Sequence, residues 1–377
     1  NQKLRPAPQR DAQRREGRKK RRLTRAAIRR RRMLRRLATF GLLLCVIGIG
    51  MYLTVTMLFR ISAIQVQTAD GTPVTAHATK GVVIATGGYA ANLQMVVDTN
   101  VYWSSDYLST STKTTNRSSL KGDGITMAQA VGADVTGMGY TQMMPISWID
   151  DGNLAFGGGN YAIYINPTTG KRFVDETSER DVLSLAEFRN GIEHNGTKGV
   201  FIELANASSK IPGPYLYGNE DVEWRQYVRT VDQLAELFAS LGLETDADTV
   251  RATIENYDKA VMAGEQPEGV KKTNPNALIG YAEKDESGNY LPETYKLDGV
   301  ELRVRFMAPS THHTMGGIKV DTERHALDAE DNVIPGLYAA GEVTGGIHGG
   351  NRLGGNAIVE IFVSGRTAAE AIQADNQ

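Results

Sequence analysis

The sequence predicts an α/β fold preceded by a helix that spans a membrane. An apolar run without a single charge covers residues 38–59. Further on, the short apolar strand "GVVIAT" (81–86) ends in a glycine pair and leads toward helical sequence. A second buried strand followed by a long helix occupies residues 333–372. Short apolar strands that alternate with helices are typical of parallel sheets covered by helices.

The apolar run is long enough to cross a bilayer. It has 22 residues, and about 20 span the hydrocarbon core. The alternatives are a buried core helix and a signal peptide, but the run exceeds the usual apolar region of about 7–15 residues and no small-residue cleavage site follows. We therefore expect a basic cytoplasmic tail at 1–37, a transmembrane helix at 38–59, and a single-pass membrane protein with a cytoplasmic N-terminus.

The charge distribution supports this topology. Residues 1–36 contain 17 Lys and Arg against two acids, although the whole chain has a net charge of only -1. Arginines beside an apolar span favour the cytoplasmic side and attract anionic lipid. We therefore expect contact with membrane lipid and no nucleic-acid partner. The only cysteine, Cys45, lies in the apolar run, which excludes an intrachain disulfide and a cysteine-based metal site. No metal is expected.

The remaining elements follow from periodicity and turn residues. Residues 61–80 indicate a β-hairpin about an Ala-Asp-Gly turn. Residues 121–135 indicate a helix with Asp123 as N-cap and with Met127 and Val131 on its apolar face. Residues 223–242 have helical periodicity throughout.

A further helix is predicted at 245–264, with Asp246 or Asp248 as cap and Gly264 as stop. A terminal helix begins within "NAIVEIFVSGRTAAEAI".

The segment "IHGGNRLGGNAI" (347–358) places Arg352 among four glycines. Glycine allows the backbone to approach a ligand closely. The planar guanidinium of arginine is the preferred partner of carboxylates and phosphates. The segment therefore indicates a site for an anionic ligand beside exposed backbone.

Three segments together resemble the fumarate reductase/succinate dehydrogenase flavoprotein family, and in particular flavocytochrome c type fumarate reductases and related ene-reductases. They are "THHTMGGIKVD…IPGLYAAGEVTGGIHGGNRLGGNAI" (311–358), "GKRFVDETSERD" (170–181) and "GVVIATGGYAAN" (81–92). The resemblance covers about residues 61–374. It implies an FAD-binding, Rossmann-like domain (60–136 and 305–377) interrupted by a capping domain with α+β character that binds substrate (137–304).

The resemblance also implies a reaction, the reduction of the C=C bond of a small α,β-unsaturated carboxylate by hydride from flavin N5. Arg180 would donate the proton, and His312 and Arg352 would hold the substrate carboxylate. Because the free pKa of arginine exceeds about 12, Arg180 can act only beside the substrate and with a relay that reprotonates it. Alternatively, Arg180 is a surface charge paired with Glu176 or Glu179.

Further positions match residues that line FAD in the family. They are Thr86, Gly87, Gly88, Asp123, His313, Gly341, Glu342, Gly354, Gly355, Asn356, Ala357 and Ile358. The histidines His77, His194 and His325 have no partner that the sequence identifies.

The sequence departs from the family around the substrate. Close fumarate reductases have a His-Pro step where "QMMPIS" carries Met144, and a Glu-x-x-Arg pair where "NLAFGGGNYA" has neither acid nor arginine. The departures favour a substrate other than fumarate, such as an unsaturated monocarboxylate with an apolar group facing Met143 and Met144. They also leave Arg180 without a visible relay.

Residues 1–80 contain no G-x-G-x-x-G turn after a soluble strand, the motif that binds the FAD pyrophosphate. Three accounts are open: a truncated or wrongly joined gene product, one half of a split flavoprotein completed by another chain, or a membrane-anchored chain without catalysis. In each we expect an exposed sheet edge, marginal stability and poor FAD binding by this chain alone. The electron donor cannot be identified, since no donor domain is recognisable. The alternative function is therefore a non-catalytic, membrane-anchored chain that does not bind FAD by itself.

Overall fold

The structure is a computed structural model that describes residues 63–67, 71–156, 158–209, 220–273, 275 and 277–376, together with Met33, Gly41 and Cys45. The chain divides into two units, Asn1–Ile61 and Ser62–Gln377, and only the second is described as a fold. Apart from Gly41 and Cys45, the predicted membrane span at 38–59 lies outside the described residues. Within the described ranges, no helix combines the length and apolar character needed to cross a bilayer.

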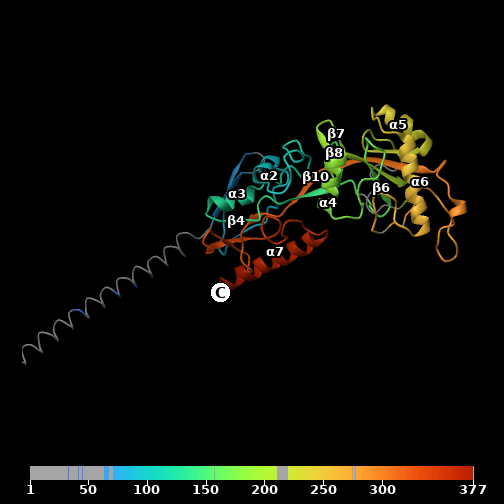
Figure 1. The fold of residues 1–377 in the computed structure, drawn as a ribbon. Coiled ribbons are helices and arrows are strands. Elements are labelled where there is room, and N and C mark those ends of the chain that lie inside the picture. The colour runs from blue at the N-terminus through green and yellow to red at the C-terminus, as the bar shows by residue number, and fades with distance from the viewer. Residues whose placement is uncertain are drawn as a thin grey trace, which may run out of the picture. The chain divides into compact units, whose positions relative to one another are not determined.

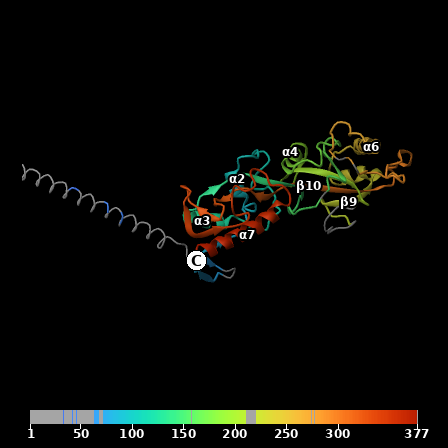
Figure 2. The same cartoon turned by 90° about the horizontal axis from the view of Figure 1, so that it is seen from below.

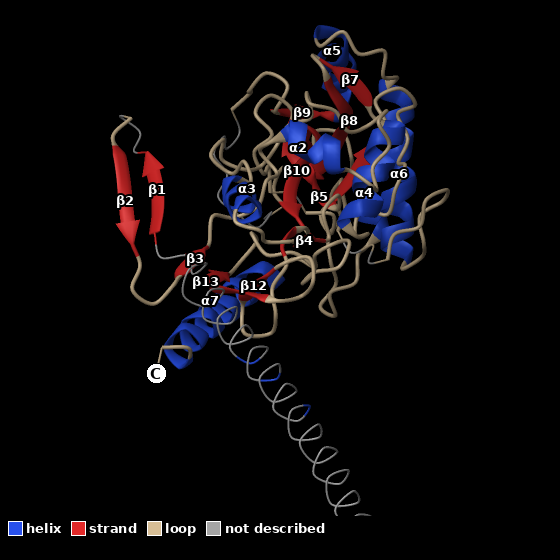
Figure 3. Ribbon diagram, turned by 90° about the vertical axis from the view of Figure 1, so that its left-hand side faces the viewer, coloured by secondary structure: helices blue, strands red, loops and turns tan. Residues whose placement is uncertain are grey.

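Strands β1 (Ala63–Gln67) and β2 (Pro73–His77) form an antiparallel two-stranded ribbon, in which Ala63 lies opposite His77 (Figure 3). This confirms the predicted hairpin. The ribbon leads into β3 (Val82–Ile84), the apolar strand that the sequence predicts before the glycine pair.

A small three-stranded sheet has the order β12 (His325–Leu327), β13 (Val333–Ala339), β3. Strands β13 and β3 are parallel, with Leu337 opposite Val82. Because parallel strands end at the same edge, the residues after β3 and after β13 meet there. The Ala340 N–H donates to the Ile84 carbonyl at 3.0 Å across this edge.

Helix α7 (Asn356–Ala374) covers this sheet with its second half, where Ala368 and Ala371 pack on Tyr338 and Ala340. Its first half exposes an apolar face, in which Phe362 is 74% and Val359 is 64% accessible. The edge strand β3 likewise leaves its central residue, Val83, 43% accessible. An open edge and an uncovered apolar face fit the expectation of a partial domain.

The larger sheet is antiparallel and has the order β5, β10, β8, β6, with β7 on β8 and β9 on β10. Figure 1 labels β6, β7, β8 and β10 of this sheet, and Figure 2 labels β9 beside β10. Its strands are β5 (Thr141–Trp148), β6 (Ala162–Ile165), β7 (Ile192–His194), β8 (Thr197–Asn206), β9 (Gln226–Thr230) and β10 (Glu301–Thr314). The predicted domain boundary at 304/305 falls within β10, so a single strand belongs to both predicted domains.

Alternation along the strands gives the sheet two apolar faces. One face packs against helices α5 (Leu234–Ser240) and α6 (Ala247–Ala263), with Ile202 and Leu204 of β8 in that core. The opposite face, with Phe201 of β8, packs against helix α4 (Arg180–Asn190). The sheet therefore holds α4, and the arginine at its start, on the face away from α5 and α6.

Helix α6 begins and ends where the sequence predicts. The Asp246 side chain accepts from the backbone N–H groups of Asp248 and Thr249 at 3.3 and 3.2 Å, which identifies Asp246 rather than Asp248 as the N-cap. Gly264 ends the helix with φ 69°, a left-handed conformation that favours glycine.

Two helix predictions need correction. Only Leu234–Ser240 of the predicted helix 223–242 is α-helical, because Gln226–Thr230 forms β9, which pairs with the edge of β10. A short 3-10 turn, Val231–Gln233, joins them. Pairing with a neighbouring strand has here overridden local helical periodicity.

The second correction concerns helix α3 (Asp123–Ala130). Its N-cap is Gly122, with φ 82°, so Asp123 is the first helical residue and not the cap. Its buried side carries Ile125 and Ala128, whereas Met127, predicted on the apolar face, is 40% accessible. The remaining short elements are α2 (Leu93–Thr99), β4 (Val135–Thr136), β11 (Gly317–Ile318) and a 3-10 turn at Pro292–Thr294.

We predict that Ile254→Ala lowers the free energy of unfolding by about 2–5 kcal/mol, because Ile254 is fully buried between α6 and the large sheet. Urea denaturation measures the change. The control is Asn256→Ala, an exposed position on the same helix, with an expected change within about 0.5 kcal/mol. Equal effects of the two substitutions would contradict the packing of α6.

Candidate active site

Four segments that are distant in sequence bring the site together. Arg180 is the first residue of α4, Gln142 is the second residue of β5, and His312 lies near the end of β10. Arg352 belongs to the glycine-rich loop before α7. The pairing of β5 with β10 and the packing of α4 on both strands fix these positions.

Gln142 joins the two arginines. Its Oε1 accepts from Arg180 Nη1 at 3.0 Å and from Arg352 Nη2 at 3.1 Å. Its Nε2 donates to Asn351 Oδ1 and to the Arg352 carbonyl, both at 2.5 Å. The amide therefore holds two guanidinium groups on one neutral oxygen.

Neither guanidinium donates a hydrogen bond to a carboxylate among the described residues, although the charge of Glu342 acts on Arg352. Burial lowers the pKa of Arg180, and the nearby charge of Arg352 lowers it further. Burial also lowers the pKa of Arg352, which is 6% exposed and whose Nε is buried without a hydrogen-bond partner. Two cations that share one uncharged acceptor favour binding of an anion.

A pocket of about 480 Å³ opens onto these groups, a volume within the range of small-molecule sites. Arg180, Asn351, Arg352 and Gly354 line it together with Thr177, Ser178, Glu179, Val182 and Leu353. The backbone of Gly354 lies close to Arg180, since a Cβ there would be 3.4 Å from Arg180 Nη2. The sequence alternative paired Arg180 with Glu176 or Glu179. Glu176 instead binds Arg172, with Arg172 Nη2 2.8 Å from Glu176 Oε2, and the hydrogen bond of Arg180 goes to Gln142 rather than to Glu179.

His312 lies close enough to both arginines to be affected by their charges. Its Nδ1 is 2.6 Å from Thr115 Oγ1, and its carbonyl accepts from Asn116 Nδ2 at 2.8 Å. Burial lowers the pKa of His312 to about 4, with the charges of Arg180 and Arg352 acting in the same direction. The imidazole is therefore neutral at pH 7 and can serve as a hydrogen-bonding group without adding a third cation.

The next residue, His313, has different partners. Its Nδ1 lies 3.0 Å from the Thr314 carbonyl and 3.4 Å from Glu342 Oε1, and its ring packs edge-on against His348. Burial lowers its pKa to about 2, and the charge of Arg352 contributes. His312 thus lies near Arg180 and Arg352, whereas His313 lies beside Glu342. Successive side chains of a strand point to opposite faces, which explains the difference.

Glu342 lies in the loop after β13 and is hydrogen-bonded to the last residue of β10. Its Oε1 accepts from the Thr314 N–H at 3.0 Å and from Thr314 Oγ1 at 3.2 Å, and burial raises its pKa. Any Cβ on Gly88 would overlap both Thr314 Oγ1 and Glu342 Oε1. Glycine is therefore required at position 88, in the segment after β3, because Thr314 of β10 and Glu342 pack directly against its backbone.

The remaining residues predicted to line FAD lie along an accessible rim. Thr86, Asp123, Gly354, Gly355, Asn356 and Ile358 are exposed, while Gly87, Gly341 and Ala357 are partly exposed. Gly355, with φ 88°, precedes the first turn of α7, and a Cβ there would meet nothing within 4 Å. Open backbone after two parallel strands suits one wall of a dinucleotide site, and the middle of α7 lies against it, since the Gly341 N–H donates to Ser364 Oγ at 3.0 Å.

Sequence reasoning missed Gln142, Thr115, Asn116 and Asn351. The neighbours of Gln142, Met143 and Met144, drew attention as apolar substrate contacts, yet they are only 0% and 3% exposed. No spacing in the sequence brings residue 142 beside residues 180 and 352. The contact depends on the pairing of β5 with β10.

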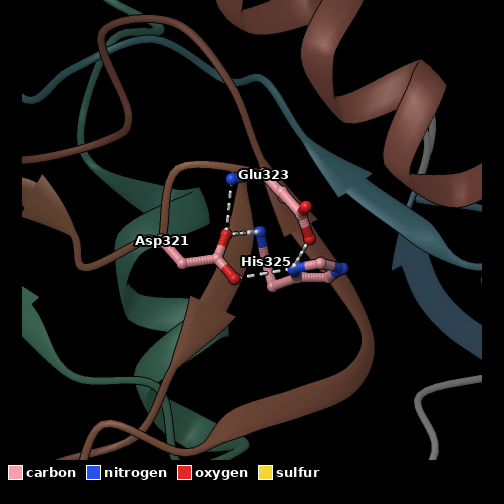
Figure 4. Close-up of side chains that lie close together, drawn as sticks. All are labelled: Asp321, Glu323 and His325. Carbon is pink, nitrogen blue, oxygen red and sulfur yellow. Dashed lines mark hydrogen bonds and ion pairs between the residues drawn. The ribbon is translucent and has the colours of Figure 1, made fainter.

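His325, for which the sequence identified no partner, lies in a separate cluster with Asp321 and Glu323 (Figure 4). Its Nδ1 lies 2.7 Å from Asp321 Oδ2 and its Nε2 lies 2.9 Å from Asp375 Oδ2. Burial alone would lower the pKa of His325, but the hydrogen bonds to the two carboxylates outweigh it and raise the pKa. Together with Glu323 this group has the composition of a metal site. However, both ring nitrogens already contact carboxylates, which favours a proton-bearing imidazolium that ties β12 to the end of α7.

We predict that the stability of the protein falls as the pH decreases from about 6.5 to about 4. In this window the unfolded chain protonates His312 while the folded state, with a pKa of about 4, does not. His312→Gln removes this contribution and should flatten the dependence of unfolding free energy on pH, measured by urea denaturation. His77→Gln, at an exposed position in β2, is the matched control. A slope unchanged by His312→Gln would contradict the buried, neutral imidazole.

Comparison with known proteins is consistent with this site. The model of the FAD binding domain family matches residues 29–358, a range that begins upstream of the resemblance placed at residue 61. The chain is 37% identical to an NADH:acrylate oxidoreductase of Vibrio harveyi over 319 residues, which are 83% of this chain and 28% of that protein. It is 33% identical to a fumarate reductase (cytochrome) of Shewanella frigidimarina over 77% of this chain and 44% of that protein. A urocanate reductase of Eggerthella lenta is 32% identical, again over 77% and 44%.

Among solved structures, the open conformation of a flavocytochrome c3 fumarate reductase superimposes with a TM-score of 0.59 at 26% identity, over 84% of this chain and 50% of that one. The 3-ketosteroid delta1-dehydrogenase of Sterolibacterium denitrificans has the same fold, with a TM-score of 0.60 at 21% identity. The chain thus spans half or less of the length of the curated relatives described above and of the flavocytochrome. The family match, which covers most of the chain, confirms the predicted resemblance and FAD as its cofactor: the chain belongs to the FAD binding domain family.

Proposed function

We propose that the protein is an FAD-dependent oxidoreductase that reduces the C=C bond of a small α,β-unsaturated carboxylate. The observation that carries the proposal is the pair Arg180 and Arg352, held on the single oxygen of Gln142 at the edge of a pocket. A carboxylate entering the pocket supplies the negative charge that this pair lacks. The named relatives act on acrylate, fumarate and urocanate, which are all unsaturated carboxylates.

Each residue then has a distinct role. Arg352 and neutral His312 bind and orient the substrate carboxylate, and the charge of Arg352 stabilises the negative charge that develops on it during reduction. Arg180 delivers a proton to the substrate carbon, and its lowered pKa brings it closer to the range of a useful acid. The backbone at Thr86–Gly88, Gly341–Glu342 and 354–358 would hold FAD, which supplies hydride from its reduced ring when bound.

The substrate we favour is an acrylate-type monocarboxylate rather than fumarate. Where close fumarate reductases carry a histidine, this chain has Met144, which is buried in β5. Beside it, Gln142 already fills the space between the arginines. The site therefore offers one strong carboxylate position, with apolar methionines in the same strand.

The proposal also includes a membrane anchor and a division of the chain into an FAD-binding part and a capping part. Residues 38–59 would form a single-pass membrane anchor with a cytoplasmic N-terminus, supported by the charge-free run and the basic tail before it. Residues 60–136 and 305–377 would bind FAD, and 137–304 would cap the site, supported by the separate large sheet. The exposed edge of β3 and the apolar face of α7 favour a second possibility, that this chain alone binds FAD poorly.

We predict that Arg180→Gln slows reduction of substrate by about 10²–10⁴-fold, the usual contribution of a general acid. Stopped-flow oxidation of the prereduced flavin by acrylate measures this step. The FAD content and the rate of flavin reduction by dithionite should be unchanged. Because FAD content is measured first from the visible spectrum, a flavin-free protein would overturn the proposed function itself. A flavin-loaded variant with the wild-type rate would exclude only the role of Arg180.

A second prediction concerns specificity. The ratio kcat/KM for acrylate should exceed that for fumarate, since the site has one carboxylate position and lacks the second histidine. Steady-state assays with both acids under the same donor check this. A clear preference for fumarate would rule out the monocarboxylate assignment.

A further inference from the structure

A buried acid lies on the same helix face as Arg180. In α4, Arg180, Leu183, Ser184 and Glu187 follow the i, i+3, i+4, i+7 spacing that places side chains on one face. Leu183 joins the core beneath the helix, and Ser184 and Glu187 are both 0% exposed. The sheet side of α4 therefore presents a guanidinium, a hydroxyl and a carboxyl group in succession.

Neither polar group beyond Arg180 has a partner. Both oxygens of Glu187 and the Oγ of Ser184 are buried without a hydrogen bond. Such groups are rare, because burying an unpaired polar atom costs free energy that a nonpolar residue would avoid. Two of them at adjacent positions on one helix face, next to a proposed acid, call for an explanation in terms of function.

Burial dominates the electrostatic environment of Glu187, and no ion pair joins its carboxyl group to another described residue. Across the sheet, Glu203 of β8 is ion-paired with Arg305 of β10, and β5 carries no titratable side chain. Tyr164 of β6 is close enough to Glu187 for the two to interact: burial raises the pKa of Tyr164, and the charges of Glu203 and Glu187 raise it further. Burial raises the pKa of Glu187 well above its ordinary value, which favours the protonated carboxyl group.

Arg180 needs such a proton source. After giving a proton to substrate it must be recharged, and residues 153–162 lack the acid and arginine that would do this. Along the helix, Ser184 lies about 6 Å from Arg180 and Glu187 about 4.5 Å further, at about 1.5 Å rise per residue. These are rises of the backbone along the helix axis, and the Ser184 hydroxyl together with bridging water would have to carry the proton between the side-chain groups.

We propose that Glu187 is the proton reservoir for Arg180, with the hydroxyl of Ser184 between them. The proposal rests on the proposed function and gives α4 a second task, in which it carries both the proton donor and the group that recharges it. Glu187 contacts neither substrate nor cofactor and is a relay residue.

The proton balance closes over one turnover. One alkene carbon receives the hydride that the proposed function assigns to reduced FAD, and the other receives a proton from Arg180. The neutral guanidine takes the Ser184 hydroxyl proton while Ser184 takes the carboxyl proton of Glu187. The resulting carboxylate regains its proton from water after the saturated product leaves, so the net reaction consumes one hydride and one proton.

The first test does not require activity. In infrared difference spectra, the carbonyl stretch of a protonated carboxylic acid should be present in the full chain at pH 7 and shift in D₂O. Glu187→Gln should remove that component, whereas Glu255→Gln, at an exposed position in α6, should leave it unchanged. A spectrum unaffected by Glu187→Gln shows that Glu187 is ionised and overturns the reservoir.

The second test is kinetic and uses flavin-loaded protein. Glu187→Gln should slow steady-state reduction of acrylate, with dithionite as the electron donor, about tenfold or more, because every turnover after the first needs a recharged Arg180. The loss should increase as pH rises, because fewer protons then reach Arg180 from solvent. Ser184→Ala should slow it similarly, and Glu187→Asp should restore part of the rate. Flavin reduction and urea stability should stay close to wild type.

The outcomes separate the two proposals. A Glu187→Gln variant with the wild-type rate and pH profile refutes the relay and leaves the reductase intact. A wild-type chain that binds flavin but reduces no unsaturated carboxylate refutes the proposed function and the relay that depends on it, even if the infrared spectrum shows a protonated Glu187.

Discussion

The site depends on one constraint, that two guanidinium groups share the amide oxygen of Gln142. Arg180 comes from a helix on the large sheet and Arg352 from a loop that follows the small sheet, so the amide links the two halves of the fold. The cost of holding these like charges together in a partly buried place has to be met by the packing of β5, β10 and α4. The same cost becomes binding free energy when an anion replaces the amide oxygen.

The positive charge of the two arginines also affects the titratable groups around them, His312 and Glu342. A third cation would make the site less stable, and His312 stays neutral because burial and the two arginines lower its pKa. Glu342, the nearest acid in the loop after β13, is engaged by Thr314 rather than by a guanidinium. In the proposed function, the carboxylate of the substrate supplies the negative charge that the two guanidinium groups lack.

Local sequence signals predicted much of this structure. The glycine-flanked Arg352 and the "SERD" segment that contains Arg180 are short motifs whose chemistry does not depend on long-range pairing. The cap and stop of α6 and the first hairpin are equally local, and the structure confirms them. Roles for His312, Arg180 and Arg352 in catalysis stay predictions.

The features that were missed arise from contacts between distant segments. Residues 226–230 became β9 because β10 offered an edge, and Gln142 entered the site because β5 pairs with β10. Glu187 had no local motif at all, and only its burial without a partner singles it out. Periodicity reports which face of a helix is apolar, but not which polar group that face will enclose.

The central claim is that the Arg180–Gln142–Arg352 group binds a carboxylate. Calorimetric titration of the full chain with propanoate, a saturated acid that cannot be reduced, tests it most directly. The account predicts saturable binding that is lost in Arg352→Met and absent for the methyl ester. Equal affinity of the wild type and of Arg352→Met for propanoate would contradict it.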